Sequence, residues 1–155
     1  MSAQLPPASQ RYYDDYPLGA VFEFGEAAVT EAEILEFAKK FDPQDMHVDP
    51  ASAAAGEFGG LIASGWHTAG LMMRLFAEHY LPKGGLPSPG IDELRWTRPV
   101  RPGDTLRVRV TVLEAVPSRS KSDRGMIRAL IEVLNQKSQV VMTAKPMNMH
   151  RMRPA

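Results

Sequence analysis

A carboxylate and an imidazole five residues apart are the side chains of this sequence best suited to proton-transfer chemistry. Asp42 is followed by Pro43, and His47 is followed three residues later by Pro50. Because proline disfavours helical dihedral angles in the residue before it, we expect the preceding helix to end near Phe41 or Asp42 and both side chains to lie in a loop. An Asp beside a His can share the acid and base roles of a proton transfer. Such a pair is also common in solvated polar turns, so by itself it does not define a function.

A glycine-rich connection and an apolar helix follow the pair. Residues 64–81 predict a helix with Ser64 as its N-cap, and the helix is apolar almost all round, so we expect other elements to enclose it. Its N-terminus carries free backbone N–H groups and the positive end of the helix dipole, and Gly65 allows a ligand to approach the backbone. This geometry suits a developing oxyanion. Gly59, Gly60 and Gly65 are equally consistent with a tight strand-to-helix connection, and glycine content alone favours that structural explanation.

The remaining sequence predicts the elements that hold this helix. Strand patterns occur at residues 21–24, 91–98, 106–112, 126–133 and 139–149. The clearest is 106–112, where apolar residues alternate with Arg and Thr as in a strand with one buried face. Another helix, opened by Thr30 with Glu33 three residues later in the reciprocal capping pattern, leads into Asp42. Several long antiparallel strands together with one apolar helix predict the α+β class.

Length and composition exclude several classes of protein. The 155 residues predict a flexible N-terminal arm at residues 1–12 and a single domain at 13–155. Because 18 basic residues balance 18 acidic residues, we expect no nucleic-acid partner and no attraction to a membrane surface. The absence of cysteine excludes disulfides and thiolate chemistry. With no signal-peptide pattern and no apolar run of roughly 20 residues, we expect a cytoplasmic protein.

Three other groups of polar residues suggest less. Asp45 and Asp49 flank the imidazole, but they lack the ligand spacing of a calcium loop and a second nearby His for zinc, so no metal site is predicted. His67, one turn into the apolar helix, is expected to pack rather than to react. The cations at 119, 121 and 124 lie in a hairpin loop, where they could meet nucleotide phosphates, although a solvated turn is the more common arrangement.

These segments together resemble a known family. The resemblance is carried by residues 37–38, 42–50, 58–65 and 98–106, the last reading Arg-Pro-Val-Arg-Pro-Gly-Asp-Thr-Leu. They are similar to the MaoC-like dehydratases, the (R)-specific enoyl-CoA hydratases of the hotdog superfamily, over about residues 17–149. The resemblance implies a hotdog fold, in which an antiparallel β-sheet wraps around the central apolar helix.

The resemblance also implies roles for individual residues. Asp42 and His47 match the two catalytic positions of the family, and Gly65 matches the glycine whose amide binds the thioester oxygen. The Asn-Pro pair of the family motif is replaced by Gln44 and Asp45. Ser64 stands where a His is usual, and Trp66 where a Met or Leu is usual. By the same resemblance, Ser64, Trp66 and Gly60 are expected to contact substrate.

The implied activity is the reversible addition of water to a trans-2-enoyl thioester, most simply of coenzyme A, to give the (R)-3-hydroxyacyl thioester. No cofactor is expected, since the acyl-CoA thioester is the substrate, and the family implies a homodimer or a dimer of dimers that joins sheets edge to edge. Because one fold hosts several functions, two alternatives stay open: a hotdog acyl-CoA thioesterase, in which Asp42 directs water to the thioester carbonyl, and a non-catalytic acyl-thioester-binding subunit.

Overall fold

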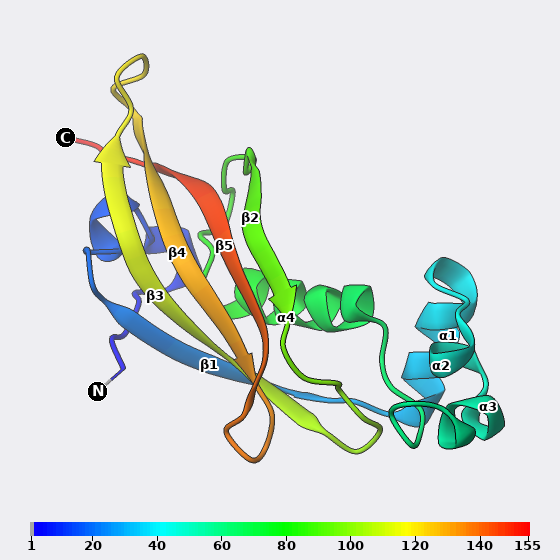
Figure 1. Ribbon diagram of the computed structural model, residues 1–155. Helices are drawn as coiled ribbons and strands as arrows, with labels where there is room; N and C mark the ends of the chain where they lie inside the picture. Colours follow the sequence, from blue (N-terminus) through cyan, green and yellow to red (C-terminus); the bar gives the residue numbers. More distant parts are fainter. Residues whose placement is uncertain (1) are drawn as a thin grey trace.

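The computed structural model describes residues 2–155, and its main element is one antiparallel sheet of five strands in the order β1-β3-β4-β5-β2. The strands are β1 Val21–Ala28, β2 Gly90–Trp96, β3 Thr105–Pro117, β4 Arg124–Leu134 and β5 Val140–Arg151. The long helix α4, Gly65–His79, crosses the concave face of this curved sheet (Figure 1). The expected α+β class, with a sheet wrapped around one helix, is therefore confirmed.

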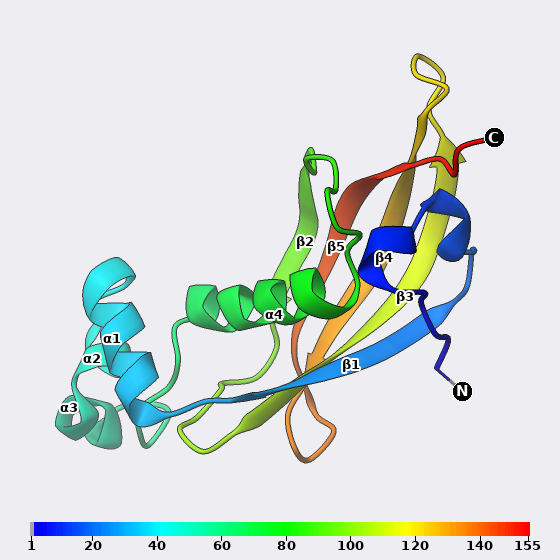
Figure 2. The same cartoon turned by 180° about the vertical axis from the view of Figure 1, so that it is seen from behind.

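One face of α4 and the inner face of the sheet form the core. The buried residues of the helix are His67, Thr68, Leu71, Met72, Leu75 and Phe76. They meet alternate residues of the long strands, for which Val108, Val110 and Ile131 are representative and nearly inaccessible to solvent. Seen from behind, in Figure 2, the helix lies against the sheet along one side only. The expected enclosure all round is thus incomplete in the single chain, and Trp66 and Met73 remain 59% and 44% exposed.

Three shorter α-helices precede α4 and lie beyond its N-terminal end, away from the sheet (Figure 1). They are α1 Glu31–Phe41, α2 Asp45–Val48 and α3 Pro50–Ala55. The α1 helix begins after Thr30, whose hydroxyl accepts from the Glu33 amide at 3.2 Å, one of the two bonds of the expected cap. It ends at Phe41, as the proline spacing predicts. His47, however, lies in the single turn of α2 and not in an irregular loop, which corrects the expectation for this residue.

The N-terminal segment is attached to the domain. The Ala3 amide donates to the Val21 carbonyl at 2.6 Å, and the Lys83 amide donates to the Ala8 carbonyl at 2.9 Å. The Arg11 guanidinium adds a bond of 3.1 Å to the carbonyl of Leu81. Residues 2–12 are thus bonded to β1 and to the α4–β2 connection, and the flexibility expected for residues 1–12 stays a prediction. Across these described residues, no helix is long and apolar enough to cross a membrane.

Candidate active site

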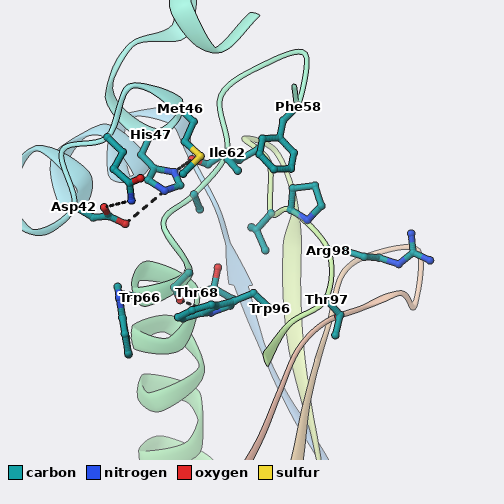
Figure 3. A pocket seen from close by; sticks show the side chains of 15 residues that line it. Asp42, Met46, His47, Phe58, Ile62, Trp66, Thr68, Trp96, Thr97 and Arg98 are labelled. Carbon is teal, nitrogen blue, oxygen red and sulfur yellow. Dashed lines mark hydrogen bonds and ion pairs between the residues drawn. The ribbon is translucent and has the colours of Figure 1, made fainter. Parts of the chain in front are cut away.

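Asp42 and His47 face each other beside the N-terminus of α4. Asp42 is the C-cap residue of α1, and its amide donates to the Ala38 carbonyl at 2.8 Å, which places its side chain at the end of that helix. His47 is buried, and its Nδ1 lies 2.7 Å from the carbonyl oxygen of Ile62. Its Nε2 lies 3.5 Å from Asp42 Oδ2 (Figure 3). Ala38, before the pair in the sequence, and Ile62, after it, thus help to position the two residues.

The contact with Ile62 defines the tautomer of the imidazole. A carbonyl oxygen only accepts hydrogen bonds, so Nδ1 of His47 must carry a proton. In the neutral ring, Nε2 then has a lone pair that faces the Asp42 carboxylate. At 3.5 Å the two atoms are too far apart for a strong hydrogen bond. Two acceptors side by side are suited to bind the two O–H groups of one water molecule.

Two short hydrogen bonds hold the Asp42 carboxylate. The Ser64 hydroxyl donates to Oδ2 at 2.7 Å, and the Gln44 side-chain amide donates to Oδ1 at 2.7 Å. The Ser64 hydrogen bond is the main reason why the pKa of Asp42 is lowered from its usual value; the Gln44 bond and the nearby His47 act in the same direction, whereas partial burial opposes them. Asp42 is therefore a carboxylate at neutral pH and accepts hydrogen bonds at the site.

Gly65 opens α4 and lies directly beneath an aromatic ring. As the first residue of the helix, it has an amide without an intrahelical partner. The Trp96 indole donates from Nε1 to the Gly65 carbonyl at 2.9 Å. A Cβ at position 65 would lie 2.3 Å from Cε2 of that ring. The glycine is thus required for a steric reason, close approach of Trp96, in addition to the access to the backbone that the sequence suggested.

These residues line a pocket of about 430 Å³ at the N-terminus of α4. Trp66 and Trp96 meet edge to face in its wall, with ring centroids 5.1 Å apart and planes at 80°. Much of the remaining lining is apolar and includes Met46, Phe58 and Val100. Figure 3 shows Asp42 and His47 at one side of the pocket and the Trp96 ring below them. An apolar pocket with a few convergent polar groups is the usual form of a small-molecule site.

The six residues that the sequence placed in the site occupy different positions. Asp42, His47, Gly65 and Trp66 line the pocket. Ser64 is fully buried behind it, where its hydroxyl accepts from the Trp66 amide at 3.2 Å as the expected N-cap and donates to Asp42. The sixth, Gly60, is not among the lining residues, and a Cβ there would lie 3.5 Å from the Arg101 guanidinium. Ser64 and Gly60 therefore lie behind or beside the lining residues: Ser64 contacts Asp42, and Gly60 lies next to Arg101.

The pocket has several lining residues that the sequence did not single out, above all Trp96, Phe58 and Arg98. Trp96 was interpreted only as part of a strand, although a large aromatic residue at the end of a strand, next to a proline-containing loop, was a usable signal. His67 lies outside the pocket, as expected of a packing residue, and stacks on Phe37 with centroids 5.0 Å apart. Burial lowers the pKa of His67 from its usual value, so the ring is neutral at neutral pH.

Metal ligands were not expected from the sequence. Between residues 2 and 155, no group of three or more His, Asp or Glu side chains is arranged to hold a metal ion.

Comparison with known proteins identifies relatives of this chain. Residues 15–133 match the model of the MaoC like domain. The 3-hydroxyacyl-thioester dehydratase Z of Mycobacterium tuberculosis is 41% identical over 108 residues, 68% of this chain and 72% of that protein. The 3-hydroxybutyryl-CoA dehydratase of Methylorubrum extorquens is 30% identical over 123 residues, 76% of this chain and 74% of that protein.

Solved structures agree with these relatives. The MaoC-like dehydratase from Rhodospirillum rubrum superposes with a TM-score of 0.88 at 40% identity, over 94% of this chain and 99% of that one. The R-hydratase PhaJ1 from Pseudomonas aeruginosa superposes with a TM-score of 0.74 at 28% identity, over 92% of this chain and 86% of that one. These neighbours confirm the expected hotdog fold.

Proposed function

The chain belongs to the MaoC-like domain family, and on that premise we propose that it catalyses the reversible hydration of a trans-2-enoyl thioester to the (R)-3-hydroxyacyl thioester. The observation that supports this proposal best is the pair of acceptors, Asp42 Oδ2 and His47 Nε2, 3.5 Å apart at the wall of an apolar pocket. The relatives that dehydrate 3-hydroxyacyl thioesters favour the same class of substrate, and the similarity to an R-hydratase favours the (R) product.

In this mechanism one water molecule donates its two O–H groups to Asp42 and His47. As the water oxygen forms a bond to the β-carbon of the enoyl group, Nε2 of His47 accepts one of its protons. The double bond opens towards the α-carbon, and negative charge develops on the thioester oxygen. The imidazolium then gives this proton to the α-carbon. The hydroxyl hydrogen and the new α-hydrogen of the product therefore come from one water molecule. Dehydration follows the same steps in reverse.

We assign the base to His47 because of the hydrogen bonds around its partner. The bonds from Ser64 and Gln44 lower the pKa of Asp42, which makes its carboxylate a weak base. The carboxylate instead orients the water and stabilises the imidazolium by its charge. The two groups interact closely, so a pH profile reports apparent pKa values of the pair rather than of either residue alone.

The Gly65 amide is proposed to stabilise the charge on the thioester oxygen. It lies at the positive end of the α4 dipole, and among residues 2–155 it donates to no protein acceptor. A donor placed at a developing oxyanion is typically worth about 3 to 4 kcal/mol of transition-state stabilisation.

A direct assay tests the proposal. Hydration of crotonyl-CoA removes the ultraviolet absorbance of the enoyl thioester without releasing thiol, hydrolysis releases thiol, and a binding protein does neither. We expect Asp42→Asn and His47→Ala each to abolish most of the hydration in a folded protein, and the double variant to lose little more, because the two residues act as a unit. Near wild-type turnover by either single variant would eliminate the assignment, and thiol release by the wild type would identify a thioesterase.

The assembly is proposed to be a homodimer. Strand β2 is one edge of the sheet, and its Ile91 side chain is 47% exposed. The outer face of α4, with Trp66 and Met73, is also uncovered in the single chain. An exposed strand edge and an exposed apolar face are features that association with a second copy removes. Sedimentation of the wild type at a dimer mass, and of an Ile91→Lys variant at a lower mass, is the expected result; a wild type that sediments as a monomer would contradict it.

A further inference from the structure

A second hollow, lined mainly by polar residues, continues from the mouth of the candidate active site. It lies between the Arg98–Asp104 loop and the β4–β5 turn, and it shares Arg98 and Pro99 with the catalytic pocket. Its charged lining residues are Arg98, Arg101, Lys137 and Asp104. Three cations therefore meet one carboxylate at the entrance of the site, although the net charge of the whole chain is zero.

The cations of this hollow lack carboxylate partners. Within residues 2–155, no carboxylate oxygen lies within 4.0 Å of the charged nitrogens of Arg98, Arg101 or Lys137. On the outer face of the sheet the situation is different. There, Arg109 binds Glu132 at 3.0 Å, and Lys145 pairs with Glu93. Arg98, Arg101 and Lys137 thus differ from these paired cations of the sheet, because no carboxylate neutralises them.

The single carboxylate of the hollow, Asp104, accepts hydrogen bonds from a side chain and a backbone amide of the surrounding loops. Asp104 Oδ1 accepts from the Gln136 side-chain amide at 2.9 Å, and Oδ2 accepts from the Arg101 amide at 2.9 Å. Arg101 in turn donates through its guanidinium to the Phe58 carbonyl at 2.7 Å. Asp104 therefore joins the 98–104 loop to the β4–β5 turn, and Arg101 binds the Phe58 segment. The charged groups of Arg98 and Lys137 remain available to a ligand.

The position of Arg98 relates this hollow to the reaction. In Figure 3 the Arg98 side chain extends away from Asp42 and His47, on the far side of Phe58 and Trp96. A ligand that reaches from the reacting carbons to Arg98 must cross an apolar stretch before it meets positive charge. The other cluster of cations that the sequence suggested for phosphates, around Arg119, lies at the tip of the β3–β4 hairpin, at the opposite end of the sheet (Figure 1).

We propose that Arg98 and Lys137 form an anion site for the nucleotide phosphates of coenzyme A, so that this protein selects the CoA thioester over thioesters that lack the nucleotide. The proposal rests on the proposed function, since it names which thioester the same site uses. An uncharged pantetheine arm fits the apolar stretch, and phosphates fit the two free cations beyond it. A concave site between two loops suits a small phosphate group better than the broad surface of a carrier protein.

The test compares two thioesters of one acyl group, crotonyl-CoA and crotonyl-pantetheine, with the wild type and an Arg98→Ala/Lys137→Ala double variant. We expect the wild type to favour crotonyl-CoA, and the double variant to lose about tenfold of this preference in kcat/KM, mainly through KM. Added salt should reduce the same preference in the wild type. The matched control is Arg119→Ala/Lys121→Ala, which removes two exposed cations at the hairpin tip and should leave the preference unchanged.

A second measurement needs no catalysis. The two tryptophans of the chain, Trp66 and Trp96, both line the pocket, so their fluorescence reports its occupation directly. Free CoA should bind the wild type more tightly than pantetheine, and the Arg98→Ala/Lys137→Ala variant should lose most of that difference. If the wild type hydrates neither thioester, the proposed function fails, and this titration still decides whether the anion site exists.

Three results would overturn the anion site. One is a CoA preference that the Arg98→Ala/Lys137→Ala variant retains in full. Another is an equal loss of kcat/KM by the double variant with crotonyl-CoA and with crotonyl-pantetheine, which would mean that the cations shape the pocket and do not contact the nucleotide. The third is a loss of kcat/KM with a crotonyl carrier-protein thioester as large as the loss with crotonyl-CoA, which would identify the cations as a docking surface for an acidic protein.

Discussion

Replacement of Ser64 by alanine separates two roles of one hydroxyl. Ser64 Oγ accepts from the Trp66 amide at 3.2 Å as the N-cap of α4, and it donates to Asp42 Oδ2 at 2.7 Å. Loss of the cap should cost about 1 kcal/mol in the free energy of unfolding. Loss of a hydrogen bond to a charged group is worth about 1.5 to 3 kcal/mol. The second effect acts on the ionised form of Asp42 and should therefore appear in the pH dependence of the activity.

The direction follows from the contacts of the carboxylate. Removal of the Ser64 hydroxyl should raise the pKa of Asp42, because its hydrogen bond is the largest cause of the lowered value. The pKa should stay below its usual value because Gln44 still donates to Oδ1 at 2.7 Å. The Asp42 pKa is lowered in the wild type, and activity needs the carboxylate, so activity is lost as pH falls through that pKa. The higher pKa in Ser64→Ala should therefore move the acid limb of kcat/KM towards higher pH.

A matched variant isolates the capping effect. Thr30 caps α1 in the same way, accepting from the Glu33 amide at 3.2 Å, and it contacts no carboxylate of the pocket. Thr30→Ala should lower the melting temperature by a similar amount and leave the acid limb in place. The reasoning fails if Ser64→Ala and Thr30→Ala give the same pH profile of kcat/KM, since Ser64 would then serve the helix and not the carboxylate.

Three other perturbations address the aromatic wall and the core. Helix propensity alone predicts that Gly65→Ala keeps or raises the melting temperature, but a Cβ would lie 2.3 Å from the Trp96 ring, which predicts the opposite. The Gly65→Ala variant should melt at a lower temperature than the wild type and have lower activity. A second change, Trp96→Ala, should restore part of the stability. A Gly65→Ala protein as stable as the wild type would contradict this. Trp66→Leu should shift turnover towards longer acyl chains by roughly 1 to 3 kcal/mol per methylene group accommodated, as measured over a series of enoyl thioesters; an unchanged chain-length profile in a folded variant would show that the ring only packs. Burial lowers the pKa of His150 to about 4, so stability is complete above the usual value of 6.5 and falls as pH drops towards 4. Between pH 7 and 4.5, the decrease in the free energy of unfolding should be smaller in His150→Phe than in the wild type by about 2 kcal/mol, as measured by chemical denaturation. An unchanged pH dependence would show that other groups cause the sensitivity to acid.

The sequence predicted the elements of the fold because their signals are local. Alternation in residues 106–112 identified a strand that the structure extends to Thr105–Pro117, and Ser64 correctly opened the central helix. Proline spacing correctly ended α1 at Phe41. The one-turn helix around His47 was missed, since four residues give no periodicity to detect. The attachment of residues 2–12 was also missed, because those backbone bonds reach strands and loops distant in the sequence.

Parts of the candidate site depend on tertiary contacts that no local pattern encodes. The spacing of Asp42 and His47 suggested a pair, but their separation of 3.5 Å is set by Ile62 and Ser64, which approach from the other end of the connection. Trp96 comes from a strand 31 residues beyond Gly65, the residue whose carbonyl its indole binds. Sequence alone could not indicate that the close approach of this ring leaves no room for a side chain at position 65.

The departures from the family motif have a physical explanation in the charge of Asp42. Position 44, where the motif has asparagine, carries a glutamine whose side chain reaches back two residues to Oδ1. Position 64, where a histidine is usual, carries a serine that donates to Oδ2. Both donors favour the ionised carboxylate, and the Ser64 bond is the largest cause of the lowered pKa of Asp42. A histidine at position 64 would change its own charge near neutral pH, whereas a hydroxyl does not. Two substitutions that weaken the sequence match thus keep the carboxylate ionised over a wide range of pH, which is the state that the proposed role of Asp42 requires.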